Sequence, residues 1–374
     1  MPIGISRIIT SFLLMLFIVV ITVASVEGIC SIILFLQEVA NNPQLPIAER
    51  KHTEYDRELG WINTPGVYVE DMYGSGIDLK INSQGFRNNQ DFAHSPPLDK
   101  LRVICSGDSF TFGVGVDNDH TWPSLLSSLD KRLQTVNMGQ GGYGFGQAYL
   151  WYKREGTKLE YDIHIVGLFP PMFDRMKKDE FLGYGKPRLN LRDDHLVVEN
   201  IPVPKRVYYL PWLVRNGPMI KKLKSVELVG QIREGIAPNR GPKEVLSAKR
   251  VCDITSKIFE SLRELNLTQN SILILVFLPW RESYNVKTSE PFIKFVRREA
   301  KKQGFLLIDL VEEFKQLPPD EVAKIFLPEG DYSYRYAAGH YSVKGNKFIA
   351  NKLYAHLILL PGIIDKLSHL SPIY

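Results

Sequence analysis

The sequence predicts an α/β fold built on a doubly wound parallel sheet. From residue 101 onward, short apolar runs typical of buried strands alternate with helix-like stretches. The runs are mostly apolar and do not alternate with polar residues, as in parallel sheets that are covered by helices on both faces. The strand-like runs are LRVIC, LQTVNM, DIHIVGLF, SILILVFL and GFLLIDL, and helices are expected at 122–133, 243–265, 291–302 and 342–356.

The composition is that of a globular protein large enough for one main domain and an appendage, with 374 residues, 44% of them hydrophobic and 23% charged. The net charge is only +5, and the basic residues are scattered along the chain. We therefore expect no nucleic-acid partner. The three cysteines form no CxxC spacing, so neither a metal site nor a disulfide framework is indicated, and no cofactor is expected.

The N-terminal region, residues 1–40, is predicted to be a membrane anchor. Residues 8–26 carry no charge, and the apolar sequence resumes after Glu27 and Gly28. The apolar segment, about 8–36, thus reaches the ~20 residues that span a bilayer. The alternative is a cleaved signal peptide, which has a shorter apolar core of roughly 7–15 residues.

The charges around this segment predict its orientation. Arg7 precedes it, whereas Glu27, Glu38 and Glu49 follow. Basic residues favour the cytoplasmic side of a span. We therefore expect a single-pass protein whose main domain is extracytoplasmic, either periplasmic or extracellular.

Two further segments interrupt the regular pattern. Residues 41–100 are predicted to be a linker followed by a small β-rich element, because short β-prone runs are separated by Gly and Pro. Residues 101–374 form the main domain, with an insertion at about 175–244 that is rich in prolines, basic residues and aromatics. Ligands of open α/β sheets bind outside the carboxyl ends of the strands, where such an insertion can act as a lid or a partner surface.

The stretch VICSGDSFTFG places a serine in a conspicuous position. If LRVIC is a strand, Ser109 lies just past its carboxyl end, and the next helix offers N–H groups and a positive dipole end to an oxyanion. A serine nucleophile needs a base, and His340 directly precedes a predicted helix. Taken singly, such features more often belong to an ordinary strand-to-helix turn or to a structural or solvated histidine, so His340 is a candidate only jointly with Ser109.

The segments GDSFTFG, NMGQGGYG and GHYSVKGN, in this order, resemble the SGNH/GDSL hydrolase superfamily, over residues 101–357. LGW and INSQGFR are similar to the prefix of its membrane-anchored bacterial members, some of which are connected with acyl groups on exported polysaccharides. The resemblance implies a flavodoxin-like three-layer fold and ester chemistry. It also implies that Ser109 is the nucleophile and an oxyanion N–H donor, that Gly142 (or Gly139) is the oxyanion glycine, and that His340 is the base.

The chain departs from the family pattern in two blocks. The third block usually reads Gly-x-Asn-Asp, whereas this chain has GLFPPMFD, with Met172 or Phe173 in place of the asparagine. The fifth block usually carries an aspartate two or three residues before the histidine, where this chain has Ala338 and Ala337. Asp331 is the candidate orienting carboxylate, and a backbone carbonyl or a Ser-His dyad are the alternatives.

The sequence thus leads to two hypotheses. The first is a membrane-anchored serine esterase or O-acyltransferase that forms an acyl-enzyme and acts on an acyl ester or an acylated, exported glycan. The second is a catalytically weakened domain of the same fold that binds a glycan or an assembly partner.

Overall fold

The computed structural model describes residues 3–41, 51–182, 184–204, 224–225, 228, 232, 245–284, 290–330, 332–334 and 336–370. The chain divides into two compact units. The first comprises residues 1–50 and 205–244, and the second comprises residues 51–204 and 245–374. The second unit contains both Ser109 and His340.

In the first unit, helix α1 (Ile3–Asn41) contains the apolar segment. Within it, Thr10–Leu34 is 25 residues long and apolar enough to cross a membrane by length and composition. The one acidic residue of this stretch, Glu27, is buried and accepts the backbone N–H of Ser225 at 3.0 Å and that of Lys224. The carboxylate is therefore satisfied by backbone donors, as a buried charge requires.

The second unit is built on a five-stranded sheet in the order β13-β12-β7-β5-β6. Its strands are β5 (Leu101–Gly107), β6 (Leu133–Gly139), β7 (Ile163–Leu168), β12 (Ile272–Phe277) and β13 (Leu306–Asp309). All neighbouring strands pair in parallel. Counted along the chain from the β6 edge, the order is 2-1-3-4-5, which is the flavodoxin-like arrangement. The predicted fold class is confirmed.

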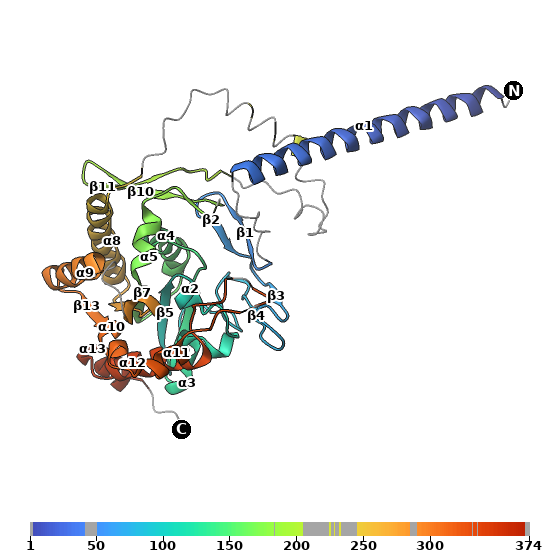
Figure 1. Cartoon of the computed structure of the whole chain (residues 1–374). Helices are drawn as coiled ribbons and strands as arrows, with labels where there is room; N and C mark the ends of the chain where they lie inside the picture. Colours follow the sequence, from blue (N-terminus) through green and yellow to red (C-terminus); the bar gives the residue numbers. More distant parts are fainter. Residues whose placement is uncertain are drawn as a thin grey trace. The chain divides into compact units, whose positions relative to one another are not determined.

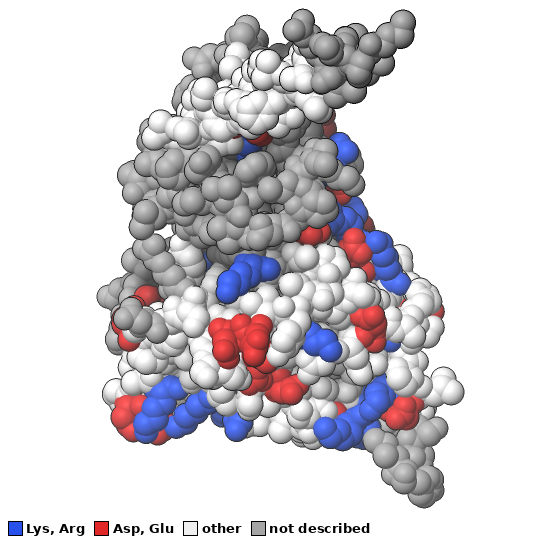
Figure 2. Space-filling model, turned by 90° about the vertical axis from the view of Figure 1, so that its right-hand side faces the viewer, with Lys and Arg blue, Asp and Glu red and all other residues white. Residues whose placement is uncertain are grey.

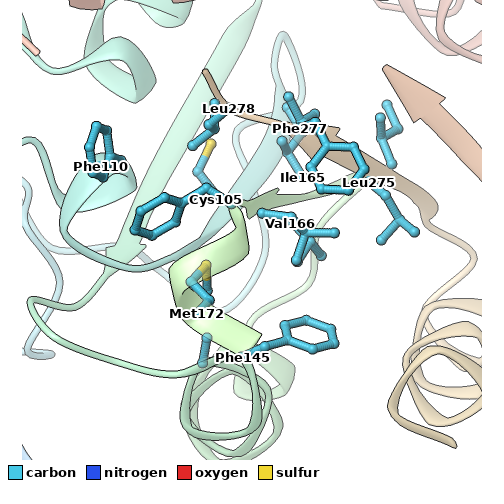
Figure 3. Close-up of a cluster of buried hydrophobic side chains, with 14 of the residues drawn as sticks. Cys105, Phe110, Phe145, Ile165, Val166, Met172, Leu275, Phe277 and Leu278 are labelled. Atoms are coloured by element: carbon cyan, nitrogen blue, oxygen red, sulfur yellow. The ribbon is translucent and has the colours of Figure 1, made fainter. Parts of the chain in front are cut away.

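Helices cover both faces of this sheet (Figure 1). One layer contains α4 (Phe145–Glu155), α5 (Pro170–Met176), α8 (Ala248–Thr268) and α9 (Glu290–Gln303). The other contains α3 (Trp122–Leu129), α10 (Leu310–Lys315), α11 (Pro319–Ile325) and α12 (Val343–Leu357). The short helix α13 (Pro361–Ser368) follows α12. Strand side chains such as Cys105, Ile165 and Phe277 are fully buried in the core between the layers (Figure 3).

The limits of helices α3 and α8 differ most from the predicted ones. Helix α3 ends at Leu129 rather than at 133, because Asp130 turns the chain and β6 already begins at Leu133. Helix α8 begins at Ala248 rather than at 243, because the Ser247 side chain caps it by accepting the N–H of Arg250 at 3.1 Å.

Residues 51–100 are part of the sheet unit, whereas the sequence analysis assigned 41–100 to a separate element. They form two small antiparallel pairs, β1 (Thr53–Asp56) with β2 (Gly60–Asn63), and β3 (Tyr68–Val69) with β4 (Leu79–Lys80). Arg87 joins them to the main domain: its buried guanidinium donates to the carbonyl oxygens of Phe112, Gly113 and Val116. A buried cation held by backbone carbonyls stabilises the loop that follows Ser109.

The predicted insertion at about 175–244 is divided between the two units. Its first part continues α5 to Met176 and then forms two hairpins. These are β8 (Glu180–Phe181) with β9 (Tyr184–Gly185), and β10 (Arg188–Arg192) with β11 (His195–Glu199). Most of 205–244 lies outside the described residues.

The described surface mixes both signs of charge. On the face drawn in Figure 2, Lys and Arg side chains are interspersed with Asp and Glu. This distribution accords with the small net charge of +5.

Candidate active site

Ser109 begins a single helical turn at the carboxyl end of β5. Helix α2 (Ser109–Phe112) has only four residues and ends at Gly113, which is left-handed. Asp108 caps it, with Oδ1 accepting the N–H of Phe110 at 3.0 Å. The positive dipole end that the sequence predicts for the helix at Ser109 is therefore that of a single helical turn. The position itself, between β5 and β7 where the strand order reverses, is the ligand-binding crevice of such sheets.

Gly139, the last residue of β6, lets this turn pack directly on the sheet. A Cβ atom at position 139 would lie 2.1 Å from the backbone nitrogen of Phe112. The N–H of Gly139 donates to Asn137 Oδ1 at 3.0 Å. Gly139 therefore serves packing, and its N–H is already engaged, so Gly142 is the better oxyanion candidate of the two.

The structure brings the predicted nucleophile and base together. His340 Nε2 lies 2.8 Å from Ser109 Oγ, although the two residues are 231 positions apart in the chain. The ring of Phe110 packs against that of His340 with centroids 4.9 Å apart. A hydroxyl within hydrogen-bond distance of an imidazole is the arrangement that activates a serine nucleophile.

The other ring nitrogen of His340 faces the backbone. Nδ1 lies 3.3 Å from the carbonyl oxygen of Ala337. Because a carbonyl can only accept, this contact favours the tautomer with the proton on Nδ1, which leaves Nε2 as the acceptor for the Ser109 hydroxyl. The predicted orienting carboxylate, Asp331, lies outside the described residues.

Two backbone N–H groups are available to an oxyanion. Among the described residues, neither the N–H of Ser109 nor that of Gly142 has an acceptor. Gly142 is left-handed, with φ +79, and an added Cβ would lie 3.0 Å from the Phe181 ring. Gln140 holds this turn over β5, because its N–H donates to the Gly107 carbonyl at 3.2 Å. Free, buried N–H groups are what an oxyanion hole requires.

Trp61, from the β1–β2 hairpin, clamps the Gly142 turn from outside. Its Nε1–H donates to the carbonyl of Gly141 at 2.9 Å, and the hydroxyl of Tyr143 donates back to the carbonyl of Trp61 at 2.5 Å. The segment before the main domain therefore helps to shape the site. The sequence analysis noted LGW as part of a prefix without this role.

Replacing Trp61 by phenylalanine is expected to lower kcat for a small ester about tenfold with little change in KM, because one support of the Gly142 turn is lost. The assay is p-nitrophenyl acetate hydrolysis by the full chain in detergent. Trp151→Phe is the matched control, since its indole N–H has no partner among the described residues. Equal kcat in the two variants would count against the clamp.

Asp108 and Arg175 form a buried ion pair beside the nucleophile. Arg175 Nη1 donates to Asp108 Oδ2 at 2.8 Å, and the Asp108 side chain is 1% exposed. Burial raises the pKa of Asp108, against the opposing effect of the Arg175 charge. Sequence reasoning missed Arg175. An aspartate directly after a buried strand is a signal that a cation is needed.

The third block places an aromatic ring near the pair. Phe169 packs against Phe110, with centroids 4.8 Å apart. Met172 and Phe173 are both fully buried in the core, where Phe173 stacks on Phe292 at 5.1 Å and Met172 belongs to the cluster in Figure 3. Phe169, rather than the Met172 or Phe173 named from the sequence, therefore packs on the residue that follows Ser109.

A second Ser-His contact is structural. Ser106 Oγ lies 2.7 Å from His164 Nε2 inside the sheet, and the His164 ring stacks on Tyr152 at 3.8 Å. Burial lowers the pKa of His164 to about 3. Because the pair is sealed in the core, it cannot meet a substrate. No group of three or more metal-ligating side chains is found within the described part of the chain.

Comparisons with known proteins found no matching family model and no match among curated proteins. Three of the similar solved structures are a lipolytic protein of the G-D-S-L family from Veillonella parvula, an acetyl xylan esterase, and a lipase/acylhydrolase from Enterococcus faecalis. Their identities are 11%, 13% and 11%, and their TM-scores 0.39, 0.40 and 0.38. The alignments cover 70%, 69% and 73% of this chain, and 100%, 100% and 99% of the respective structures. These likenesses are distant, so the case for chemistry depends on the chain's own residues.

Proposed function

We propose that the protein is a serine esterase or O-acyltransferase of the SGNH/GDSL type that acts on ester-linked acyl groups. The observation that carries the proposal is the 2.8 Å contact between Ser109 Oγ and His340 Nε2 at the crevice of the sheet. The N–H groups of Ser109 and Gly142, which have no acceptor in the described part of the chain, support it. The candidate substrate is an acyl ester, including the acyl groups of an exported glycan.

In the first half-reaction, Ser109 Oγ attacks the ester carbonyl carbon while its proton passes to His340 Nε2. The carbonyl oxygen becomes an oxyanion and accepts hydrogen bonds from the N–H groups of Ser109 and Gly142. As the intermediate collapses, the carbon–oxygen bond to the alcohol breaks and His340 returns the proton to the leaving oxygen. The acyl group is then bonded to Ser109.

In the second half-reaction, His340 takes a proton from the acceptor, which attacks the acyl carbonyl and frees Ser109. Water as acceptor completes an esterase cycle, and a sugar hydroxyl completes an acyl transfer. Both outcomes use the same residues, so the acceptor depends on what binds next to the acyl-enzyme.

A second candidate function, binding without turnover, is favoured by one feature. Phe169 is apolar and cannot donate a hydrogen bond to the oxyanion as the family's asparagine would. Losing one such donor lowers the rate by about 10²–10³ in a well-studied serine protease. A domain weakened in this way could still hold an acylated glycan or an assembly partner in the crevice.

For the location we propose a single-pass membrane protein with its main domain outside the cytoplasm. Support comes from the span Thr10–Leu34 and from the placement of Arg7 before it. A cysteine introduced at the exposed Leu98 should react with a membrane-impermeant maleimide in intact cells. Labelling only after lysis would indicate the opposite orientation, with the main domain in the cytoplasm.

The proposed activity is tested by treating the full chain, in detergent, with a fluorophosphonate probe. We expect one probe per chain, located at Ser109 by mass spectrometry, and no labelling of Ser109→Ala, because the activated hydroxyl forms the phosphonyl bond. Absence of labelling in a folded wild-type protein would overturn the enzyme proposal and favour binding.

A further inference from the structure

Asp108 presents a problem for a nucleophile at Ser109. Its Oδ2 lies 3.3 Å from Ser109 Oγ, so this carboxylate oxygen competes with His340 Nε2 for the serine proton. The carboxylate is also buried, and in such surroundings a negative charge acts strongly on its neighbours. An uncompensated Asp108 would oppose the oxyanion that forms beside Ser109.

Arg175 is placed to remove this opposition. Its Nη1 donates to the same Oδ2 atom at 2.8 Å and also to the carbonyl of Tyr143 at 2.9 Å. Tyr143 directly follows Gly142. The guanidinium therefore joins the Ser109 turn and the Gly142 turn, the two places whose N–H groups are free among the described residues.

Two aromatic rings hold the guanidinium in place. Its central carbon lies 5.4 Å from the Phe169 centroid and 4.9 Å from that of Phe181. The Arg175 side chain is 16% exposed, so its charge is only partly screened by water. Within the described part of the chain, Nε and Nη2 of Arg175 have no acceptor.

We propose that Arg175 is a positioning residue for acyl transfer: it neutralises Asp108 and holds the Gly142 turn against the Ser109 turn. The inference rests on the proposed function. In this chain β7 is followed by Phe169 and not by an asparagine that could donate to the oxyanion. The inference assigns part of the electrostatic stabilisation of the oxyanion to the Arg175 cation on α5. Arg175 acts through Asp108 and the backbone.

The charge argument makes a prediction that a merely structural role does not. Arg175→Met leaves Asp108 buried without its cation, and kcat for p-nitrophenyl acetate is expected to fall about 100-fold with KM changed less than about threefold. Removing both charges in Asp108→Asn/Arg175→Met is expected to recover at least about tenfold of that loss. Removing one partner of a buried pair is costly, whereas removing both can be nearly neutral.

Two further variants sharpen the test. Arg175→Lys keeps the charge and is expected to retain kcat within about tenfold of the wild type. The control is Arg132→Met, which breaks the 2.7 Å ion pair with Asp130, whose side chain is 7% exposed. That pair precedes β6, at the opposite end of the sheet from Ser109, so kcat should not change.

The experiment measures kcat, KM and the rate of fluorophosphonate labelling for the full chain in detergent. Wild-type labelling at Ser109 establishes the proposed function, after which the variants decide the role of Arg175. The role is overturned if Arg175→Met keeps kcat within about threefold, or if the double variant is no faster than Arg175→Met. If Arg175→Met does not fold, a double variant within about tenfold of the wild type supports the role, and a slower one overturns it. A folded wild type that does not label overturns the proposed function and the role of Arg175 with it.

Discussion

Replacing His340 by alanine is expected to lower kcat for p-nitrophenyl acetate by about 10³-fold or more, with a small change in KM. A serine hydroxyl is a weak nucleophile until a base takes its proton, and His340 Nε2, at 2.8 Å, is the base that the described structure offers. Because the two residues act as one unit, the double variant Ser109→Ala/His340→Ala should be no slower than Ser109→Ala alone.

His356→Ala is the matched control for this change. His356 lies on α12, pairs with Glu313 and is 46% exposed, so its loss should leave kcat unchanged. A His340→Ala protein that keeps a tenth or more of the wild-type kcat would contradict the proposed role of the pair. Losses of kcat that add independently in Ser109→Ala/His340→Ala would also contradict it.

Gly139→Ala is expected to destabilise the fold by about 3 kcal/mol and to lower kcat by about 10²-fold. The added methyl would lie 2.1 Å from Phe112 N and 2.5 Å from its Cα. Both are backbone atoms, so the strain cannot be relieved by turning a side chain. Helix α2 must move, and Ser109 moves with it.

Chemical denaturation followed by tryptophan fluorescence, together with the ester assay, measures both effects on the full chain. Gly330→Ala is the matched control, because an added methyl there would lie 3.8 Å from the Tyr332 ring, an ordinary contact. We expect that variant within about 0.5 kcal/mol of the wild type. A Gly139→Ala protein as stable and active as this control would show that α2 does not depend on the close approach.

Local pattern was enough to predict the strands and the approximate helices. A buried parallel strand is mostly apolar, and each run from LRVIC to GFLLIDL is mostly apolar and forms a strand. The limits of α3 and α8 were less accurate, because caps and turns depend on single residues such as Asp130 and Ser247. The grouping of residues 51–100 with the main domain could not be seen, since it depends on distant contacts of Trp61 and Arg87.

The residues of the candidate site were likewise predictable only in part. Ser109, His340 and Gly142 could be named because three short segments, in their order along the chain, resemble the motifs of a known family, although no segment is informative alone. Arg175 could not be named, because nothing near it in sequence shows that its guanidinium meets Asp108. The register of the third block was also misjudged, since only packing shows that Phe169 faces Phe110 while Phe173 faces the core.

By itself, the sequence determined the α/β class and the apolar N-terminal segment, because these follow from periodicity and length, and its resemblance to a known family named the nucleophile and base candidates. The tertiary structure alone decided that Ser109 and His340 are in hydrogen-bond contact, that the N–H of Gly139 is engaged while that of Gly142 has no acceptor among the described residues, and that Arg175 pairs with Asp108. The contacts of Ser109 with His340 and of Asp108 with Arg175 join residues far apart in the chain. They exist only because strand order β13-β12-β7-β5-β6 brings the ends of β5, β6 and β7 to one edge.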